Sequence, residues 1–425
     1  MPRTTALVVA SLWTVTFTGV AEAQDVFYRS WRWVKETSAA RAAGLGGAMT
    51  AVPDDASGAE SNPAALTTLV KSELLGNVLN RRDGRTAEGD ALRARTGMGF
   101  LGLGGRLSSR WAVGVYLVEP QAVRLESGSS LLREGSTGAG RVEGTLTEAG
   151  ASAAWRPVSR LHVGVRLAAT RLTLDGSYRL QPASGSSVLD VQTEGGATNV
   201  TAGIGILYEA SPRVRIGLAR LGGARFEIPR TARLNGVPEQ ALDGDGPSSA
   251  RQPSVVSGGL ALLAGTRVLL TGQLDYVRYG EIQTPFASLA PGGSLPRFAV
   301  FAWEPRVGIE LSLPFSSMSL QLRAGLSGRS AAGAERGGAT GAAPLPTTPP
   351  LPSPSPSPPI APAPTRTALQ QITAVLPEAP RGTQTGSLRA AVGGSLVTAK
   401  GWRLDLAVRF GAEGGSVLAG TAIRF

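Results

Sequence analysis

The chain has 425 residues, a formal net charge of +11, no cysteine and one histidine. The absence of cysteine excludes disulfides and thiolate chemistry. His162 would have to serve any imidazole-based metal site or Ser–His nucleophile, and its apolar neighbours suggest only a polar residue facing a lumen. Nearly all of the basic residues are arginines scattered singly, whereas nucleic-acid binding needs a clustered basic surface. We therefore expect no enzyme, no cofactor and no nucleic-acid partner.

Residues 1–23 have the pattern of a cleavable signal peptide. Arg3 supplies the positive start, residues 6–20 form a short apolar stretch, and residues 21–23 read Ala-Glu-Ala, a small-x-small cleavage site. We expect the mature chain to begin at Gln24. No later run reaches the roughly 18 apolar residues of a transmembrane helix. The exported protein is therefore either soluble or a membrane β-barrel.

Residues 24–69 do not alternate between polar and apolar and are rich in Gly, Ala and Ser. Small residues allow close packing of backbone. The segment is too long for a linker and too short for a separate domain. We predict a plug, or hatch, inside a barrel lumen; the alternative is an N-terminal periplasmic extension.

From residue 70 onward the sequence repeatedly alternates between apolar and polar or small residues. Clear examples are 161–167, 306–313, 320–326 and 402–410. This is the period of a barrel strand with one face toward lipid and the other toward the lumen. A soluble β-sandwich would give the same alternation, so a barrel over residues 70–425 needs further support.

The spacing of the turns gives that support. Six connections are tight and fall near residues 108–109, 157–159, 211–212, 265–266, 316–317 and 399–401, whereas longer polar connections are expected at 81–93, 121–140, 176–195, 222–253 and 280–298. Alternating short and long connections are typical of outer-membrane barrels, whose periplasmic turns are short. Six periplasmic turns predict an antiparallel barrel of 14 strands, centred near residues 75, 100, 116, 149, 167, 204, 217, 259, 272, 307, 322, 391, 406 and 420.

The chain ends on Phe425, after the alternating residues of a final strand. A terminal aromatic in this position resembles the signal read by the barrel-assembly machinery, which we expect as a partner. Aromatic residues also occur near strand ends, as at Trp111, Trp155 and Trp402. Such residues suit an interfacial girdle. Outer-membrane lipid and lipopolysaccharide are then the expected surroundings.

Residues 342–366 are rich in proline and cannot form barrel wall, because proline lacks a backbone donor. They lie in the long connection 328–384, which the strand count places outside the cell. We expect a solvated, semi-rigid stalk; a proline-rich ligand for a recognition domain is the alternative.

Several arginines occupy the lumen-facing positions of the predicted strands. An apolar pocket that binds an acid needs a cation, because an unpaired carboxylate is costly to bury. The alternative is that each arginine pairs with a lumen acid such as Asp275, Glu310 or Asp405. The candidate ligand-contacting residues are Arg166, Arg215, Arg306, Arg323, Arg389, Arg403 and Arg409.

Residues 41–66 carry a motif of small, acidic and Asn-Pro-Ala residues: Arg41, Ala42, Gly44, Gly46, Gly47, Ala48, Asp54, Asp55, Ala56, Asn62, Pro63, Ala64 and Leu66. This motif resembles the hatch of the FadL-type family of outer-membrane transporters for long-chain fatty acids and other hydrophobic compounds. Residues 253–261, 273–279 and 305–310 are similar to wall strands of that family, whereas the Pro-rich loop is a departure.

The resemblance implies a 14-stranded barrel with an N-terminal hatch, located in the bacterial outer membrane. It implies passive uptake of hydrophobic or amphipathic molecules such as long-chain fatty acids, which bind near the hatch and leave after the hatch moves, in part laterally. The hatch-motif residues Asp54, Asp55, Asn62, Pro63 and Ala64 would take part. The alternative function is a structural or assembly barrel that acts in protein secretion or as a surface scaffold.

Overall fold

The computed structural model describes residues 38–52, 54–83, 95–131, 137–181, 189–234, 237–238, 245–278, 302–329, 387–411 and 414–425. The predicted signal peptide, the start at Gln24 and the Pro-rich residues 342–366 lie outside these ranges.

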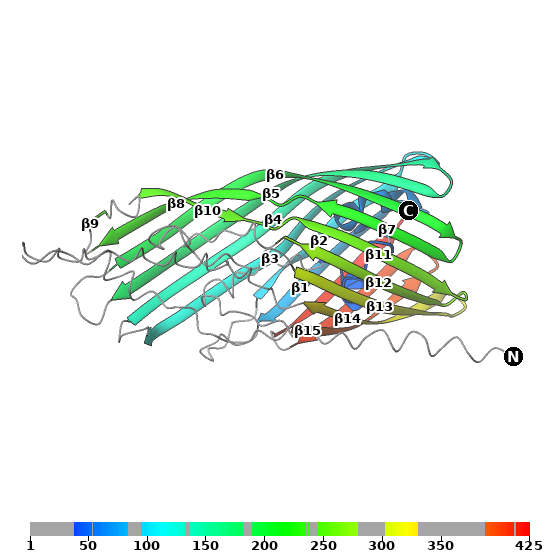
Figure 1. The fold of residues 1–425 in the computed structure, drawn as a ribbon. Coiled ribbons are helices and arrows are strands. Elements are labelled where there is room, and N and C mark those ends of the chain that lie inside the picture. The colour runs from blue at the N-terminus through cyan, green and yellow to red at the C-terminus, as the bar shows by residue number, and fades with distance from the viewer. Residues whose placement is uncertain are drawn as a thin grey trace, which may run out of the picture.

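One antiparallel sheet closes on itself to form a barrel (Figure 1). Its strands are β1 (Glu73–Asp83), β2 (Arg95–Arg106), β3 (Trp111–Leu131), β4 (Thr137–Val158), β5 (Leu161–Gln181), β6 (Leu189–Ser211), β7 (Val214–Leu221), β8 (Arg225–Leu234), β9 (Val237–Pro238), β10 (Asp245–Arg251), β11 (Val255–Ala264), β12 (Val268–Val277), β13 (Ala302–Pro314), β14 (Met318–Arg329), β15 (Ser387–Thr398), β16 (Trp402–Gly411) and β17 (Gly414–Arg424). The first and last strands pair along their whole lengths, which leaves no open edge.

The predicted number of 14 strands is confirmed. Strands β8, β9 and β10 belong to the connection between β7 and β11, which themselves pair directly. The remaining 14 strands each contain one of the predicted centres, and the six tight turns fall within a residue or two of their predicted places. Within the described residues, no helix is both long and apolar enough to cross a membrane.

Two of the predicted long connections are wrong, because strand continues through most of them. Residues 121–140 and 176–195 fall largely within β3 to β6, whereas residues 222–253 do connect β7 to β11 and contain the short strands β8, β9 and β10. Strands β3 to β6 reach 21 to 23 residues, where about 9–11 suffice to span a bilayer. Figure 1 shows these strands running beyond the rest of the barrel at one end.

The side-chain pattern of β5 explains why the strand continues. Its outward positions are apolar through Val165 and Leu167, then become polar from Arg171 onward. Its inward positions become apolar there, and Leu172 and Leu174 are fully buried. From Arg171 onward the strand is thus built as in a water-soluble sheet, with polar residues facing out. Polar outward residues in the sequence suggested loops, although they belong to strand that continues beyond the apolar outer band.

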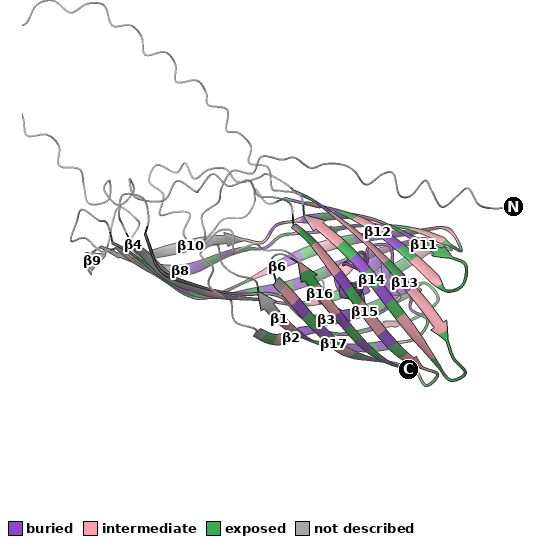
Figure 2. Ribbon diagram, turned by 90° about the horizontal axis from the view of Figure 1, so that it is seen from below, coloured by how far each residue is buried: buried purple, intermediate pink, exposed green. Residues whose placement is uncertain are grey.

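The lower part of the wall exposes apolar side chains to the outside. Val115, Leu167, Leu218 and Leu404 are each more than half exposed, and buried and exposed residues alternate along the strands (Figure 2). Trp111 and Trp155 stack with ring centroids 5.9 Å apart next to two of the tight turns. An outward apolar band bordered by aromatic residues is the arrangement of a barrel in a lipid bilayer.

Residues 38–69, here called the N-terminal segment, precede the first strand. The described residues of this segment form α2 (Ala40–Gly44), α3 (Gly58–Ser61) and the 3-10 helix η1 (Pro63–Thr68), and nearly all of them are buried. Leu45, Leu66 and Leu69 share a hydrophobic cluster with Phe100 of β2 and Tyr116 of β3. The segment therefore packs against the inward faces of the strands.

Candidate functional site

Inward-facing glycines of the wall allow the N-terminal segment to approach the strands at backbone distance. A Cβ atom on Gly205 would lie 2.0 Å from Asn62 Oδ1, and one on Gly164 would lie 2.4 Å from the Ala64 nitrogen. Real Cβ atoms do not come so close, so any side chain there would displace the segment. The same holds, against other parts of the segment, at Gly217 of β7, Gly308 of β13 and Gly325 of β14.

The Asn-Pro-Ala triplet fastens the segment to itself and to the wall. Asn62 caps η1, since its Oδ1 accepts a hydrogen bond from the Ala64 N–H at 3.2 Å. Its Nδ2 donates to the Thr50 carbonyl at 2.7 Å and to the Ile206 carbonyl of β6 at 3.3 Å. Pro63 stands at the first helical position, where no backbone donor is needed. One amide therefore joins three pieces of chain.

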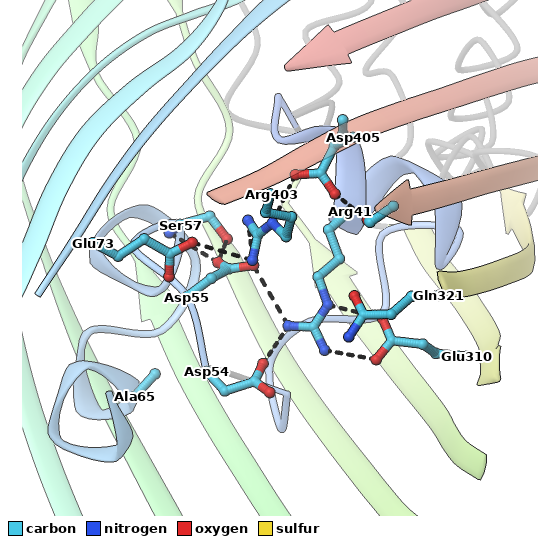
Figure 3. A network of polar contacts seen from close by, with 12 residues as sticks. Arg41, Asp54, Asp55, Ser57, Ala65, Glu73, Glu310, Gln321, Arg403 and Asp405 are labelled. Carbon is cyan, nitrogen blue, oxygen red and sulfur yellow. Dashed lines mark hydrogen bonds and ion pairs between the residues drawn. The ribbon is translucent and has the colours of Figure 1, made fainter. Parts of the chain in front are cut away.

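A buried ion network holds the other side of the segment (Figure 3). Arg41 of α2 donates from Nε and Nη2 to the carboxylate of Glu310 on β13, at 2.9 and 3.0 Å. Its Nη1 also pairs with Asp54. A fork of this kind fixes a carboxylate in both position and orientation. Arg41 thereby ties α2 to the wall and to the turn that contains Asp54.

The network continues across the wall strands. On the Glu310 side, Arg323 Nε of β14 lies 2.6 Å from Glu310 Oε2. On the other side, Arg403 Nε of β16 lies 2.8 Å from Asp405 Oδ2, and its Nη1 lies 3.1 Å from Glu73 Oε1. These charges are almost fully buried. Removal of one member would leave a charge without its partner, which is strongly destabilising.

The two aspartates of the hatch motif have different roles. Asp55 is buried, and its Oδ1 accepts hydrogen bonds from the N–H and hydroxyl of Ser57, which stabilises the turn before α3. Asp54 is about half exposed and pairs with Arg41. Partial desolvation beside the wall opposes its ionisation, but the charge and hydrogen bond of Arg41, with the charges of Arg215 and Arg424, hold the pKa of Asp54 well below its usual range. Docking of the segment therefore favours the ionised carboxylate.

A pocket lies between the N-terminal segment and the wall formed by β7, β11, β12 and β13. Apolar side chains on it are Met49, Leu221, Val255 and Val277, and polar ones are Thr50, Glu60, Ser61, Ser257, Gln273, Asp275, Glu304 and Arg306. Gln273 of β12 joins the wall to the N-terminal segment, since its Oε1 accepts hydrogen bonds from the Met49 and Thr50 N–H groups at 2.8 and 2.9 Å. The pocket can therefore hold a small, largely apolar molecule beside the segment.

The structure places the seven predicted arginines on inward positions, but most are engaged with acids. Arg166 pairs with Glu148, Arg306 with Asp275 and Glu304, Arg323 with Glu310 and Asp405, and Arg403 with Glu73 and Asp405. Arg409 donates to Ser416 at 3.0 Å. Arg215 Nε lies 3.7 Å from Glu209, and 35% of its side chain is exposed. Arg389 is half-buried on β15. Among the seven, only Arg306 lines the pocket.

Sequence reasoning missed two groups of functional residues. The first is the set of wall glycines that face the segment. The sequence feature that could have predicted them is glycine at the inward positions of an alternating strand. The second is a buried cluster in which Glu148 accepts hydrogen bonds from Tyr116 at 2.7 Å and from Arg166 at 3.0 Å. Arg166 also donates to the Glu60 carbonyl at 3.1 Å, so this cluster holds α3.

Comparison with solved structures identifies the fold. A crystal structure of a Pseudomonas aeruginosa FadL homologue matches with a TM-score of 0.57 and 12% identity, over 95% of this chain and 96% of that one. The chain has the FadL-type fold. The Ralstonia pickettii toluene transporter TbuX matches with a TM-score of 0.60 at 13% identity, over 91% and 98% of the two chains. The Pseudomonas putida toluene transporter TodX matches at 0.54 and 14%, over 90% and 96%.

The predicted resemblance to FadL-type proteins is thus confirmed for the fold. No family model and no curated protein matches the sequence. Identities of 12–14% show a shared architecture and do not assign a ligand.

Proposed function

We propose that this FadL-type barrel lies in the bacterial outer membrane and takes up hydrophobic or amphipathic small molecules by passive diffusion. The observation that carries the proposal is the pocket between the N-terminal segment and β7, β11, β12 and β13, inside a barrel with an apolar outer band. Burial of an apolar molecule there contributes about 25 cal/mol for each Å² removed from water. The toluene transporters that share the fold agree with cargo of this kind.

The N-terminal segment is the proposed hatch. It fills the lumen beside the pocket, held by the ion network on one side and by the Asn-Pro-Ala triplet on the other. Passage of a ligand requires one set of these contacts to open. The hydrogen bonds of Asn62 join it to backbone groups and involve no charge. Their rearrangement therefore leaves no buried ion without a partner. We propose that the hatch opens on the β5–β7 side.

An interruption in strand pairing next to the pocket offers a lateral exit. Strand β6 pairs with β7 through Gly203 and Leu221, and pairing resumes only between Thr193 and Arg230 of β8. Between these points Asn199 donates to the Arg225 carbonyl at 2.7 Å. Leu221, at the end of the paired stretch, also lines the pocket. A weakly paired wall at this place would let an apolar molecule reach the bilayer.

Long-chain fatty acids are the narrower form of the proposal. Their carboxylate needs a guanidinium that can leave its protein partner. Arg306 in the pocket is held by two acids, so this guanidinium would lie outside the pocket. Arg215 is the candidate among the predicted arginines, because it is a third exposed and 3.7 Å from Glu209.

The test is uptake of toluene and of a long-chain fatty acid into vesicles that contain the refolded protein and lipopolysaccharide. We expect faster uptake than into protein-free vesicles, and a changed rate for Asn62→Ala with unaltered heat-modifiable gel mobility. Uptake of both solutes at the protein-free rate would reject transport and favour an assembly or scaffold barrel.

A further inference from the structure

The acidic character of the pocket has a consequence for its ligand. Three carboxylates line it, namely Glu60 from the N-terminal segment, Asp275 from β12 and Glu304 from β13. One guanidinium, that of Arg306, lines it with them. The residues that line the pocket therefore carry an excess of negative charge.

The register of the two strands shows how Arg306 is engaged. Asp275 and Glu304 are directly opposite each other on β12 and β13, a like-charge pair that is unfavourable unless a cation lies beside it. Arg306 supplies that cation: its Nε lies 2.8 Å from Asp275 Oδ2 and its Nη2 lies 3.2 Å from Glu304 Oε2. A ligand carboxylate could pair with Arg306 only if Arg306 left Asp275 and Glu304, and these two buried acids would then face each other without a cation.

The side-chain amide of Gln273 is also engaged. Gln273 donates from Nε2 to Asp275 Oδ1 at 2.7 Å, and its Oε1 already accepts from two backbone N–H groups. The lining thus offers three carboxylates, which accept hydrogen bonds and favour a positive charge, beside the hydroxyls of Ser61 and Ser257. Its remaining surface, formed by Met49, Leu221, Val255 and Val277, suits an apolar body.

We propose that this pocket selects compact apolar molecules whose polar end is a cation or a hydrogen-bond donor, such as primary amines, over carboxylic acids. The inference rests on the proposed transport function and specifies its substrate class. The inference rests on two observations. The pocket provides the space for the ligand, and the charges of the lining acids decide which head group enters it.

The test compares three probes with the same eight-carbon chain: octylamine, octanol and octanoate. Binding is measured by calorimetry on the full barrel in nanodiscs, with empty nanodiscs subtracted for partition into lipid. We expect octylamine to bind at least tenfold more tightly than octanoate at neutral pH, with octanol between them.

A charge variant should reverse the order. Asp275→Asn combined with Glu304→Gln removes the two carboxylate charges that face Arg306, so that its guanidinium can pair with a ligand carboxylate. Octanoate should then bind more tightly than octylamine. Glu227→Gln is the control, since Glu227 is an exposed carboxylate of β8 that pairs with Arg225 and does not line the pocket, and it should keep the wild-type order. Heat-modifiable gel mobility verifies that each variant folds.

The outcomes separate the inference from the proposed function. If wild type binds octanoate as tightly as octylamine, or if the double variant keeps the wild-type order, the substrate class is wrong while transport stands. If none of the three probes binds, both the pocket's selectivity and the proposed transport are rejected.

Discussion

Gly205→Ala should undock the hatch without unfolding the barrel. The added Cβ would lie 2.0 Å from Asn62 Oδ1 and 2.9 Å from Pro63 Cδ, so the Asn62 side chain must move. That movement weakens its hydrogen bonds to Thr50 and Ile206. Overpacking of a close contact costs about 1–3 kcal/mol. A cost of about 2 kcal/mol raises the undocked population roughly 30-fold.

The assay uses Thr50→Cys as a reporter, because the chain has no native cysteine and Thr50 is 2% exposed. Labelling by a bulky water-soluble maleimide should be slow in the parent and roughly 30-fold faster with Gly205→Ala. Gly272→Ala is the matched control, since a Cβ there would meet nothing within 4 Å. Equal labelling rates in the Gly205 and Gly272 variants would refute the idea that wall glycines position the hatch.

Three further predictions are tested by the same labelling reaction or by the amount of protein in the outer membrane. Arg41→Ala should speed labelling more than Gly205→Ala, because a buried carboxylate that loses its partner costs about 3–5 kcal/mol; slower or unchanged labelling would contradict the role of Arg41. The pKa of Asp54 is lowered in the docked state, so its contribution to docking is present above the ordinary aspartate pKa of about 3.9 and is lost as the pH falls further. Because only the thiolate reacts with maleimide, each rate is divided by that of free cysteine at the same pH. The corrected rate should rise in acid, and Asp54→Asn should flatten that rise. Deletion of Phe425, whose N–H donates to the Ser72 carbonyl at 3.0 Å, should reduce outer-membrane levels while export continues, as immunoblots of membrane fractions would show.

The sequence by itself predicted the barrel and its 14 strands, because the alternation of side chains is a local property with a period of two residues. The tight turns were equally readable, since each lies between two alternating stretches only a few residues apart. The same local reasoning failed for residues 121–140 and 176–195. Their outward residues are polar, and only the pairing of β3 to β6 shows that they are strand.

Only the tertiary structure decided the partners inside the lumen. Alternation predicted inward arginines, but the pairing of Arg41 with Glu310 joins residues 269 positions apart, and no local pattern encodes it. The contact between Gly205 and Asn62 is likewise set by the curvature of the closed sheet and the path of the N-terminal segment. Closure of the barrel brings distant strands around one lumen, so the charges that a ligand meets depend on that closure and not on sequence neighbours.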